Sequence, residues 1–270
     1  MSWADLPGIT LNAEISGQGL GQGRGLVLLH ELGGSLHSFD AVIDALGDRF
    51  HVLRYDQRGA GLSEKPRAPF TIEDHATDLA ALLQWSGIEG PVILAGIAAA
   101  CAIAAEHALR HPETVAGLLL CGPVMSASGP QRTYLSDRSA RAVQDGMRAV
   151  VDPSLDRSYP PHLRGDGAEF AAYRSRMLGN DPVGYGHANM ALTRSTIADR
   201  LGGLRAPCDV LGGCDDLLRT TDQLRATAAS IPGATFAVVD SGHLMAVQTP
   251  ALLADAINTL ANRIAKEQLA

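Results

Sequence analysis

Short runs of apolar residues alternate with helical segments along this chain, and that alternation limits the folds open to it. The apolar runs are residues 26–30, 51–55, 92–95, 115–120, 210–211 and 236–239. The segments with helical periodicity are residues 72–85, 99–111, 221–231 and 250–266. Strands that are apolar on both faces are typical of a parallel sheet covered by helices on either side. The sequence therefore predicts an α/β fold with a mostly parallel central sheet, to which residues 8–17 add a short antiparallel edge.

One long stretch, from Met125 to Asp199, interrupts the alternation. It mixes helical segments, at 136–151 and 168–177, with proline and glycine breakers, which indicates a lid inserted between two strands. We expect no separate second domain and no linker. The expected division is a core of residues 1–123 and 207–270 and a helical lid of residues 124–206. A lid of this kind predicts a small, enclosed substrate.

Composition and charge exclude several classes of function. A formal net charge of -7 and an isoelectric point near 5.7 argue against non-specific nucleic-acid binding, which depends on clustered cations. The first residues contain no basic stretch followed by an apolar segment, and no window has the long uncharged run of a membrane span. We therefore expect a cytoplasmic protein that acts on a small molecule, without a membrane or nucleic-acid partner, as a monomer or a homodimer.

The sequence predicts neither a cofactor nor a metal. The turn at 58–61 lacks the third glycine of a dinucleotide-binding loop. His107 and His111 share a helical face without the carboxylate motif of a zinc protease, and we expect them at the surface. The four cysteines lack the paired spacing of a zinc site or a disulfide scaffold, so buried free thiols are expected. They are Cys101, Cys121, Cys208 and Cys214.

Residues 96–100 form the most informative local motif. They follow an apolar run and open an alanine-rich helical segment, so a strand turns sharply into a helix here. In a Gly-x-Ser-x-Gly elbow, the middle side chain of such a turn is the nucleophile. The middle residue of this chain is Ala98, and its methyl group cannot attack a carbonyl.

Five motifs in one order give the chain a resemblance to a known family. They are Leu28-Leu29-His30-Glu31-Leu32-Gly33-Gly34, Tyr55-Asp56-Gln57-Arg58-Gly59-Ala60-Gly61-Leu62-Ser63, the elbow at 96–100, Gly213-Cys214-Asp215-Asp216 and Ser241-Gly242-His243. In this order the chain resembles the α/β-hydrolase family, within it the enol-lactonase-like and small-ester hydrolase branch. The resemblance implies the α/β-hydrolase fold with an inserted lid and a nucleophile, an acid and a base at the site.

His243 and an acid after an earlier strand are the candidate proton-transfer pair. An imidazole can take and return a proton near neutral pH, and His243 follows the predicted strand 235–240, at the edge where parallel sheets build their sites. A carboxylate is needed to orient the imidazole, and Asp216 fits the family position. Asp215 is the alternative, because a shift of one residue exchanges the two. His30 is expected to brace the loop after the first parallel strand.

Two backbone N–H groups are expected to stabilise an oxyanion, those of Leu32 and Ala99. Glu31 departs from the family pattern, which has glycine after the histidine at position 30. A carboxylate close to a developing oxyanion opposes it. Either its side chain points away or bonds the lid, or it positions a water molecule or a substrate amide N–H.

Three interpretations of Ala98 are open. The first, which we favour, is a Ser-to-Ala variant whose parent hydrolyses a small ester, lactone or amide through an acyl-enzyme; this chain is then inactive or strongly impaired. In the second, Ala98 is natural and the His243–Asp216 pair performs non-covalent proton chemistry or activates water. In the third, the chain is a non-catalytic ligand receptor.

Arginines of the lid are candidates for binding a substrate carboxylate. Residues 124–206 contain eleven arginines and eight acidic residues, so this segment is positively charged within an acidic chain. A guanidinium group binds a carboxylate through two parallel hydrogen bonds. The candidates are Arg132, Arg141, Arg164, Arg174 and Arg176. The resemblance to enol-lactonases implies a small anionic substrate, of the kind met in the catabolism of aromatic or heterocyclic rings.

Overall fold

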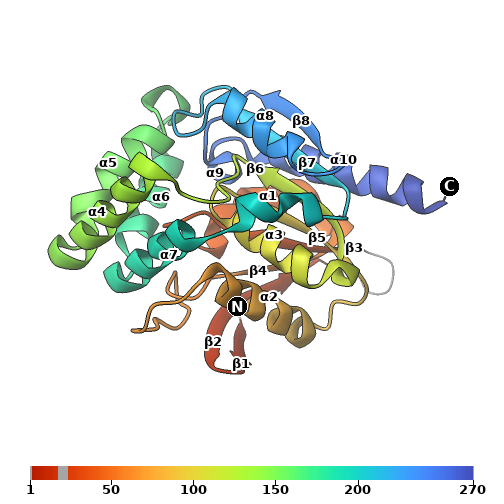
Figure 1. Cartoon of the computed structure of the whole chain (residues 1–270), viewed down its shortest axis with the longest axis horizontal. Helices are drawn as coiled ribbons and strands as arrows, with labels where there is room; N and C mark the ends of the chain where they lie inside the picture. Colours follow the sequence, from red (N-terminus) through yellow and green to blue (C-terminus); the bar gives the residue numbers. More distant parts are fainter. Residues whose placement is uncertain (1, 18–23, 270) are drawn as a thin grey trace.

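A single twisted sheet forms the centre of the molecule in the computed structural model, which describes residues 2–17 and 24–269 (Figure 1). The strands are β1 (Ser2–Leu6), β2 (Ile9–Ser16), β3 (Arg24–Leu29), β4 (Phe50–Tyr55), β5 (Val92–Ile97), β6 (Val115–Cys121), β7 (Cys208–Gly213) and β8 (Thr235–Val239). They pair in the order β1-β2-β4-β3-β5-β6-β7-β8. The β1–β2 and β2–β4 pairs are antiparallel and the other pairs are parallel, which confirms the predicted α/β fold and its antiparallel edge.

Helices cover both faces of the sheet. The core helices are α1 (Asp40–Leu46), α2 (Ile72–Ser86), α3 (Ala100–Arg110), α8 (Thr221–Ala229), α9 (Met245–Gln248) and α10 (Pro250–Leu269). On β5, Leu94 packs in one cluster with α2 and α3, whereas Ile93 packs in another with α1 and α10. Neighbouring side chains of a strand point to opposite faces, so burial on both faces explains the continuous apolar runs.

The ends of the core helices follow local capping rules. Thr71 begins α2: its hydroxyl accepts a hydrogen bond from the Asp74 N–H, and the Asp74 carboxylate accepts one from the Thr71 N–H. The same helix ends at Gly87, which is left-handed with a φ of 67°. No helix within residues 2–17 and 24–269 is long and apolar enough to cross a membrane.

The segment between β6 and β7 carries four further helices, which gather beside the sheet (Figure 1). They are α4 (Gly129–Asp145), α5 (Arg148–Ser158), α6 (Ala168–Leu178) and α7 (Pro182–Arg194). Their apolar side chains form a small core of their own that includes Val151 and Tyr173. The helix predicted at 136–151 is wrong as one element, because Gly146 adopts a φ of 79° and separates α4 from α5. The lid boundaries at 124 and 206 stay a prediction. All four of these helices lie between them.

Two expectations about burial need correction. His107 is fully buried instead of lying at the surface, and its Nε2 lies 3.0 Å from the Thr114 hydroxyl. Cys214 is an exposed free thiol, whereas the other three cysteines are free and buried as expected. In both cases the packing of neighbouring elements, which the chain's periodicity does not reveal, decides the exposure.

Candidate active site

The turn between β5 and α3 is strained at Ala98. Within the described ranges it is the only non-glycine residue with a positive φ, 53°. Its N–H donates to the Cys121 carbonyl at 2.8 Å, and its carbonyl accepts from the Val124 N–H at 3.1 Å. A Cβ at Gly96 would lie 3.1 Å from the backbone nitrogen of Cys101, so glycine permits the close approach of strand and helix. A left-handed L-residue costs about 1–2 kcal/mol, and such strain is concentrated at functional sites.

His243 and Asp216 meet at the carboxyl ends of β8 and β7. The distance between His243 Nδ1 and Asp216 Oδ2 is 2.8 Å. The other carboxylate oxygen accepts the backbone N–H groups of Leu218 and Arg219, at 2.8 and 2.9 Å. The Asp216 side chain is fully buried. These bonds fix the carboxylate, and the carboxylate in turn fixes the imidazole.

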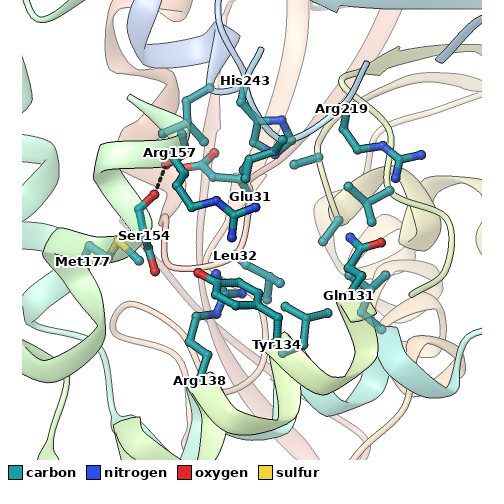
Figure 2. Close-up of a pocket in the computed structure, with 18 of the residues that line it drawn as sticks. Glu31, Leu32, Gln131, Tyr134, Arg138, Ser154, Arg157, Met177, Arg219 and His243 are labelled. Carbon is teal, nitrogen blue, oxygen red and sulfur yellow. Dashed lines mark hydrogen bonds between the residues drawn. The ribbon is translucent and has the colours of Figure 1, made fainter. Parts of the chain in front are cut away.

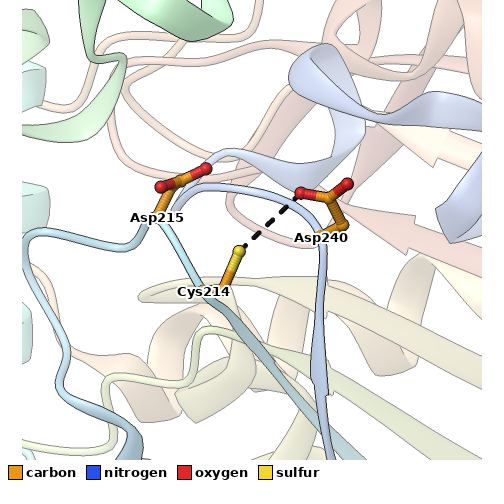
Figure 3. Close-up of side chains that lie close together, drawn as sticks. All are labelled: Cys214, Asp215 and Asp240. Carbon is orange, nitrogen blue, oxygen red and sulfur yellow. Dashed lines mark hydrogen bonds between the residues drawn. The ribbon is translucent and has the colours of Figure 1, made fainter.

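Asp215, the alternative acid, lies in a different group of side chains. Figure 3 shows it beside Cys214 and Asp240, whereas the carboxylate bonded to His243 is that of Asp216. Asp215 also pairs with His162 of the lid, at 3.3 Å. The ligand atoms of the three residues in Figure 3 lie within 4.8 Å of one another, but exposed acidic groups often gather in this way and we assign no metal to them.

The loop after β3 is braced by His30. The Nδ1 of His30 lies 2.9 Å from the Glu31 carbonyl, and its Nε2 lies 3.0 Å from the Gln57 backbone nitrogen. A tautomer protonated on Nδ1 satisfies both bonds. Both ring nitrogens are then hydrogen-bonded to backbone groups, so His30 fixes the position of this loop. Leu32 of this loop and Ala99 of the elbow line the same cavity, as oxyanion donors must.

A cavity of about 370 Å³ joins these groups. Ala98, Ala99, Leu32 and His243 line it from the core, and side chains of α4, α5, α6 and α7 line it from the lid (Figure 2). A volume near this one is typical of a site for a small organic molecule. The structure thus brings together every core residue that the motifs indicated except Asp215.

Three arginines line the cavity, and none of them was predicted. They are Arg138 of α4, Arg157 of α5 and Arg219 of the loop after β7 (Figure 2). In the described part of the chain, no carboxylate lies within 4.0 Å of any of the three. The ring of Tyr134 lies 4.7 Å from the Arg157 guanidinium and 5.3 Å from that of Arg138. Burial alone favours the neutral phenol, but the positive charge of Arg138 and hydrogen bonds outweigh it and lower the pKa of Tyr134.

The five predicted arginines do not line this cavity, and the choice of residues is corrected. Arg164 pairs with Asp156 at 3.2 Å, and Arg174 pairs with Asp152 at 2.6 Å, so both cations are neutralised within the lid. Both acids lie in α5, outside the elements that carry their arginine partners, so no short spacing in the sequence signalled these pairs.

The remaining three predicted arginines point elsewhere. Arg132 is exposed on α4, two residues before Tyr134 and therefore on the other side of the helix. Arg141 donates to the Ala149 carbonyl at 3.3 Å on the exposed side of the lid. Arg176 lines a second cavity and lies 5.8 Å from the centre of the Tyr173 ring. A signal for Arg138 was its place one helical turn after Tyr134, beside the apolar stripe of α4.

Glu31 belongs to the wall of the cavity (Figure 2). Its side chain is buried, and its Oε1 accepts a hydrogen bond from the Ser38 hydroxyl at 2.8 Å. A Cβ at Gly34 would lie 2.1 Å from Oε1, so glycine makes room for the carboxylate. Its second oxygen, Oε2, is buried and has no hydrogen-bond partner. A carboxylate oxygen left in this way is costly unless a ligand or water pairs with it.

Cys101 offers no substitute nucleophile. Its thiol is fully buried, and the Sγ lies 3.1 Å from the Gly96 carbonyl. Burial raises the pKa of the thiol well above its ordinary value, so the nucleophilic thiolate is disfavoured. The cavity residues of the elbow therefore supply no reacting side chain of their own.

Comparison with known proteins decides the family. The model of the family described as "alpha/beta hydrolase fold" matches residues 26–250. The chain belongs to the α/β-hydrolase family. The structure of this α/β-hydrolase is similar to that of the enol-lactonase from Burkholderia xenovorans LB400, with a TM-score of 0.91, 26% identity and coverage of 97% of this chain and 100% of that one.

Two further relatives of this α/β-hydrolase agree on the fold. A thermophilic esterase from Thermogutta terrifontis, solved with malate bound, has a TM-score of 0.90 at 25% identity over 98% of this chain and 99% of that one. The 3-oxoadipate enol-lactonase 2 of Acinetobacter baylyi is 23% identical over 88% of each chain. The enol-lactonase-like resemblance is confirmed.

Proposed function

We propose that this pocket hydrolyses a small ester, lactone or amide that carries a carboxylate, and that its full activity needs serine at position 98. The observation that carries the proposal is the strained turn at Ala98, with a φ of 53°, in one cavity with the His243–Asp216 pair. Strain of this kind is useful where it holds a nucleophile, and a methyl group gains nothing from it.

With serine at position 98, the steps follow from the neighbouring groups. The hydroxyl attacks the carbonyl carbon while His243 takes its proton, and the oxyanion forms near the N–H groups of Leu32 and Ala99. The C–O or C–N bond then breaks, and the imidazolium returns the proton to the leaving group. Water, deprotonated by His243, then attacks the acyl carbon, the bond to the serine oxygen breaks, and the imidazolium returns its proton to that oxygen as the acid leaves. Asp216 holds the imidazole throughout.

The substrate class rests on the charge of the cavity. Arg138, Arg157 and Arg219 supply positive charge with no carboxylate partner among the described residues, so an anionic ligand is favoured. The malate in the related esterase and the enol-lactones of the other relatives are small molecules of this kind by name.

Ala98 itself we interpret as the replacement of a serine. Without the hydroxyl no acyl-enzyme forms, but the cavity and the oxyanion donors are unchanged, so the chain binds its substrate without covalent turnover. The test is Ala98→Ser with p-nitrophenyl acetate and monomethyl succinate as substrates. We expect a rise in hydrolysis of about 1000-fold or more and an acyl adduct in the mass spectrum. Ala98→Gly is the matched control and should stay inactive.

A second candidate has its own observation. Glu31, and alanine instead of glycine at position 100, both depart from the elbow and loop patterns beside Ala98, and a single engineered replacement leaves such neighbours unchanged. In this candidate Ala98 is natural and the His243–Asp216 pair deprotonates a water molecule directly. Hydrolysis by the chain as it stands, unchanged by Ala98→Ser, would support it in place of the first proposal. Ligand binding with no turnover in either form would indicate a receptor instead.

A further inference from the structure

Glu31 is a buried charged group that the hydrolytic steps above do not use. Its exposed fraction is 1%, and it belongs to the wall of the catalytic cavity. The Ser38 hydroxyl satisfies Oε1, whereas Oε2 has no partner. No cation of the described residues lies within 4.0 Å of this carboxylate. A donor is missing at the buried Oε2, in a residue that forms part of the wall of the ligand cavity.

The neighbours of Glu31 do not fill this need. Tyr173 is also buried, and burial, the nearby charge of Glu31 and a hydrogen-bonding interaction with its carboxylate raise the pKa of the phenol well above the ordinary value. The phenol O–H does not, however, meet the geometry of a hydrogen bond to Oε2. The phenol therefore stays neutral and adds no second negative charge. His30 uses both ring nitrogens on backbone groups. The carboxylate is thus held in place by Ser38 and by the space at Gly34, with one acceptor oxygen free.

The position of Glu31 relates it to the reacting group. It directly precedes Leu32, whose N–H is the proposed donor to the substrate carbonyl, and both residues line the cavity. An N–H donor and a carboxylate acceptor on one wall match a carbonyl group with an N–H on the same side of its C–N bond, as in a primary amide, a primary carbamate or a lactam. An ester or a lactone offers the carbonyl alone, and it leaves the buried Oε2 unpaired.

We propose that Glu31 is a specificity residue that selects substrates with an N–H beside the reacting carbonyl: an amide, carbamate or lactam that also bears a carboxylate. This inference rests on the proposed function. It narrows the proposed substrates from esters, lactones and amides to those that carry an N–H beside the carbonyl. A site built to accept a hydrogen bond discriminates strongly against an analogue that lacks the donor. This discrimination is larger than the one an apolar pocket achieves against an analogue that lacks a methyl group.

Three matched ligands test it on the chain as it is, since Ala98 permits binding without acylation. They are succinamate, whose primary amide has an N–H on the carbonyl side, and monomethyl succinate and N,N-dimethylsuccinamate, which lack it. Titration calorimetry should show that succinamate binds about tenfold tighter, or more, than either of the others. Mass spectrometry of the ligands after each titration checks that none has been hydrolysed.

Variants separate this inference from the proposed function. In Glu31→Leu the tenfold preference should disappear, because the acceptor is gone, while Glu169→Leu on the exposed side of the lid should keep it. If Glu31→Leu does not fold, the ligand comparison on the unchanged chain remains decisive. Equal binding of all three ligands to the unchanged chain overturns the inference about Glu31 and leaves the hydrolase proposal intact. If none of them binds, the carboxylate site and the inference fail together.

Discussion

Arg157 lies at the open side of the cavity, where a single side chain is expected to decide whether an anion binds. Its guanidinium stacks on Tyr134 and lies in the same cavity as His243 (Figure 2). Replacing it, Arg157→Met, keeps the length and apolar stem but removes the charge. We expect the Kd for monomethyl succinate to rise about tenfold, since hydrogen bonds to charged groups contribute roughly 1.5–3 kcal/mol and solvent screens part of this. Titration calorimetry measures the change.

Arg174→Met is the matched control for this prediction. Arg174 is an exposed arginine of the lid that is paired with Asp152, outside the cavity. Its replacement should leave the Kd within a factor of about two. A loss of affinity in both variants would mean that the lid's overall charge, and not a contact of Arg157, attracts the anion.

The residues at the ends of parallel strands could be located from the sequence, whereas those of the lid could not. His243 and Asp216 follow strands whose order fixes their place, so motif order was enough. Arg138 and Arg157 depend on which side of a helix faces the cavity and on which arginines already have acidic partners. The free oxygen of Glu31 depends on Ser38, seven residues further along the chain. Such contacts arise only when distant segments pack.

At the scale of elements, the close approach of β7 and β8 holds the acid and the base together. Asp215 N donates to the Ser241 carbonyl at 3.0 Å, and Cys214 N donates to the Val239 carbonyl at 2.9 Å. Gly213, the last residue of β7, directly precedes these two residues, and a Cβ there would lie 2.3 Å from the Ser241 carbonyl oxygen. The contact is with backbone, which cannot move away from an added Cβ unless the loop after β7 and the loop after β8 separate.

Gly213→Ala is therefore expected to destabilise the fold and to disturb the site. Overpacking of a buried position costs typically 1–3 kcal/mol, and we expect about 2–3 kcal/mol here because the contact is with backbone. Urea denaturation measures the loss. The downfield proton resonance of a His Nδ1–H bonded to a carboxylate should also weaken, which reports the His243–Asp216 bond without requiring activity.

Gly202→Ala is the matched control, because the added methyl group meets no neighbouring atom. Nothing lies within 4 Å of a Cβ built at Gly202, and its φ is not positive. This replacement should be neutral or stabilise the protein by up to about 1 kcal/mol, through the unfolded chain. Equal destabilisation by the two alanines would show that the approach of the loops is not what Gly213 provides.

Strand positions were predictable because a buried strand needs continuous apolar residues, as at 92–95 and 115–120. The break between α4 and α5 was not, since a glycine inside a helical pattern is sometimes tolerated and only its φ of 79° ends the helix. The position of the elbow could be predicted from the sequence, whereas the strain at Ala98 is evident only from its backbone angles.

At the scale of the whole molecule, two buried histidines couple the helical layer of α2 and α3 to pH. His75 lies in α2 and His107 in α3, and these helices pack against each other on one face of the sheet. Burial, followed by the positive charge of Arg58, lowers the pKa of His75 to about 3. Burial also lowers the pKa of His107 to about 4, against the effect of its hydrogen bond to the Ala76 carbonyl. Both are neutral in the folded protein at neutral pH.

The sign of the pH dependence follows from the unfolded chain, where histidine titrates near 6.5. Above that value neither the folded nor the unfolded state protonates these two histidines, so they do not lower the free energy of unfolding. As the pH falls below about 6.5, the unfolded state binds two protons that the folded state refuses until about pH 4 and 3. Each histidine then lowers the free energy of unfolding by about 1.4 kcal/mol per pH unit.

Urea denaturation at a series of pH values from 7.5 to about 5 tests this coupling. The free energy of unfolding should be level above about pH 6.5 and fall below it with a slope close to two protons. His107→Gln should remove about one proton from that slope, whatever its effect at pH 7.5, because one titrating group has been lost from the unfolded state. His51→Gln, a partly exposed residue of β4, is the control and should leave the slope nearly unchanged. A level curve down to pH 5 in the unchanged protein would mean that both imidazoles reach solvent and protonate without unfolding.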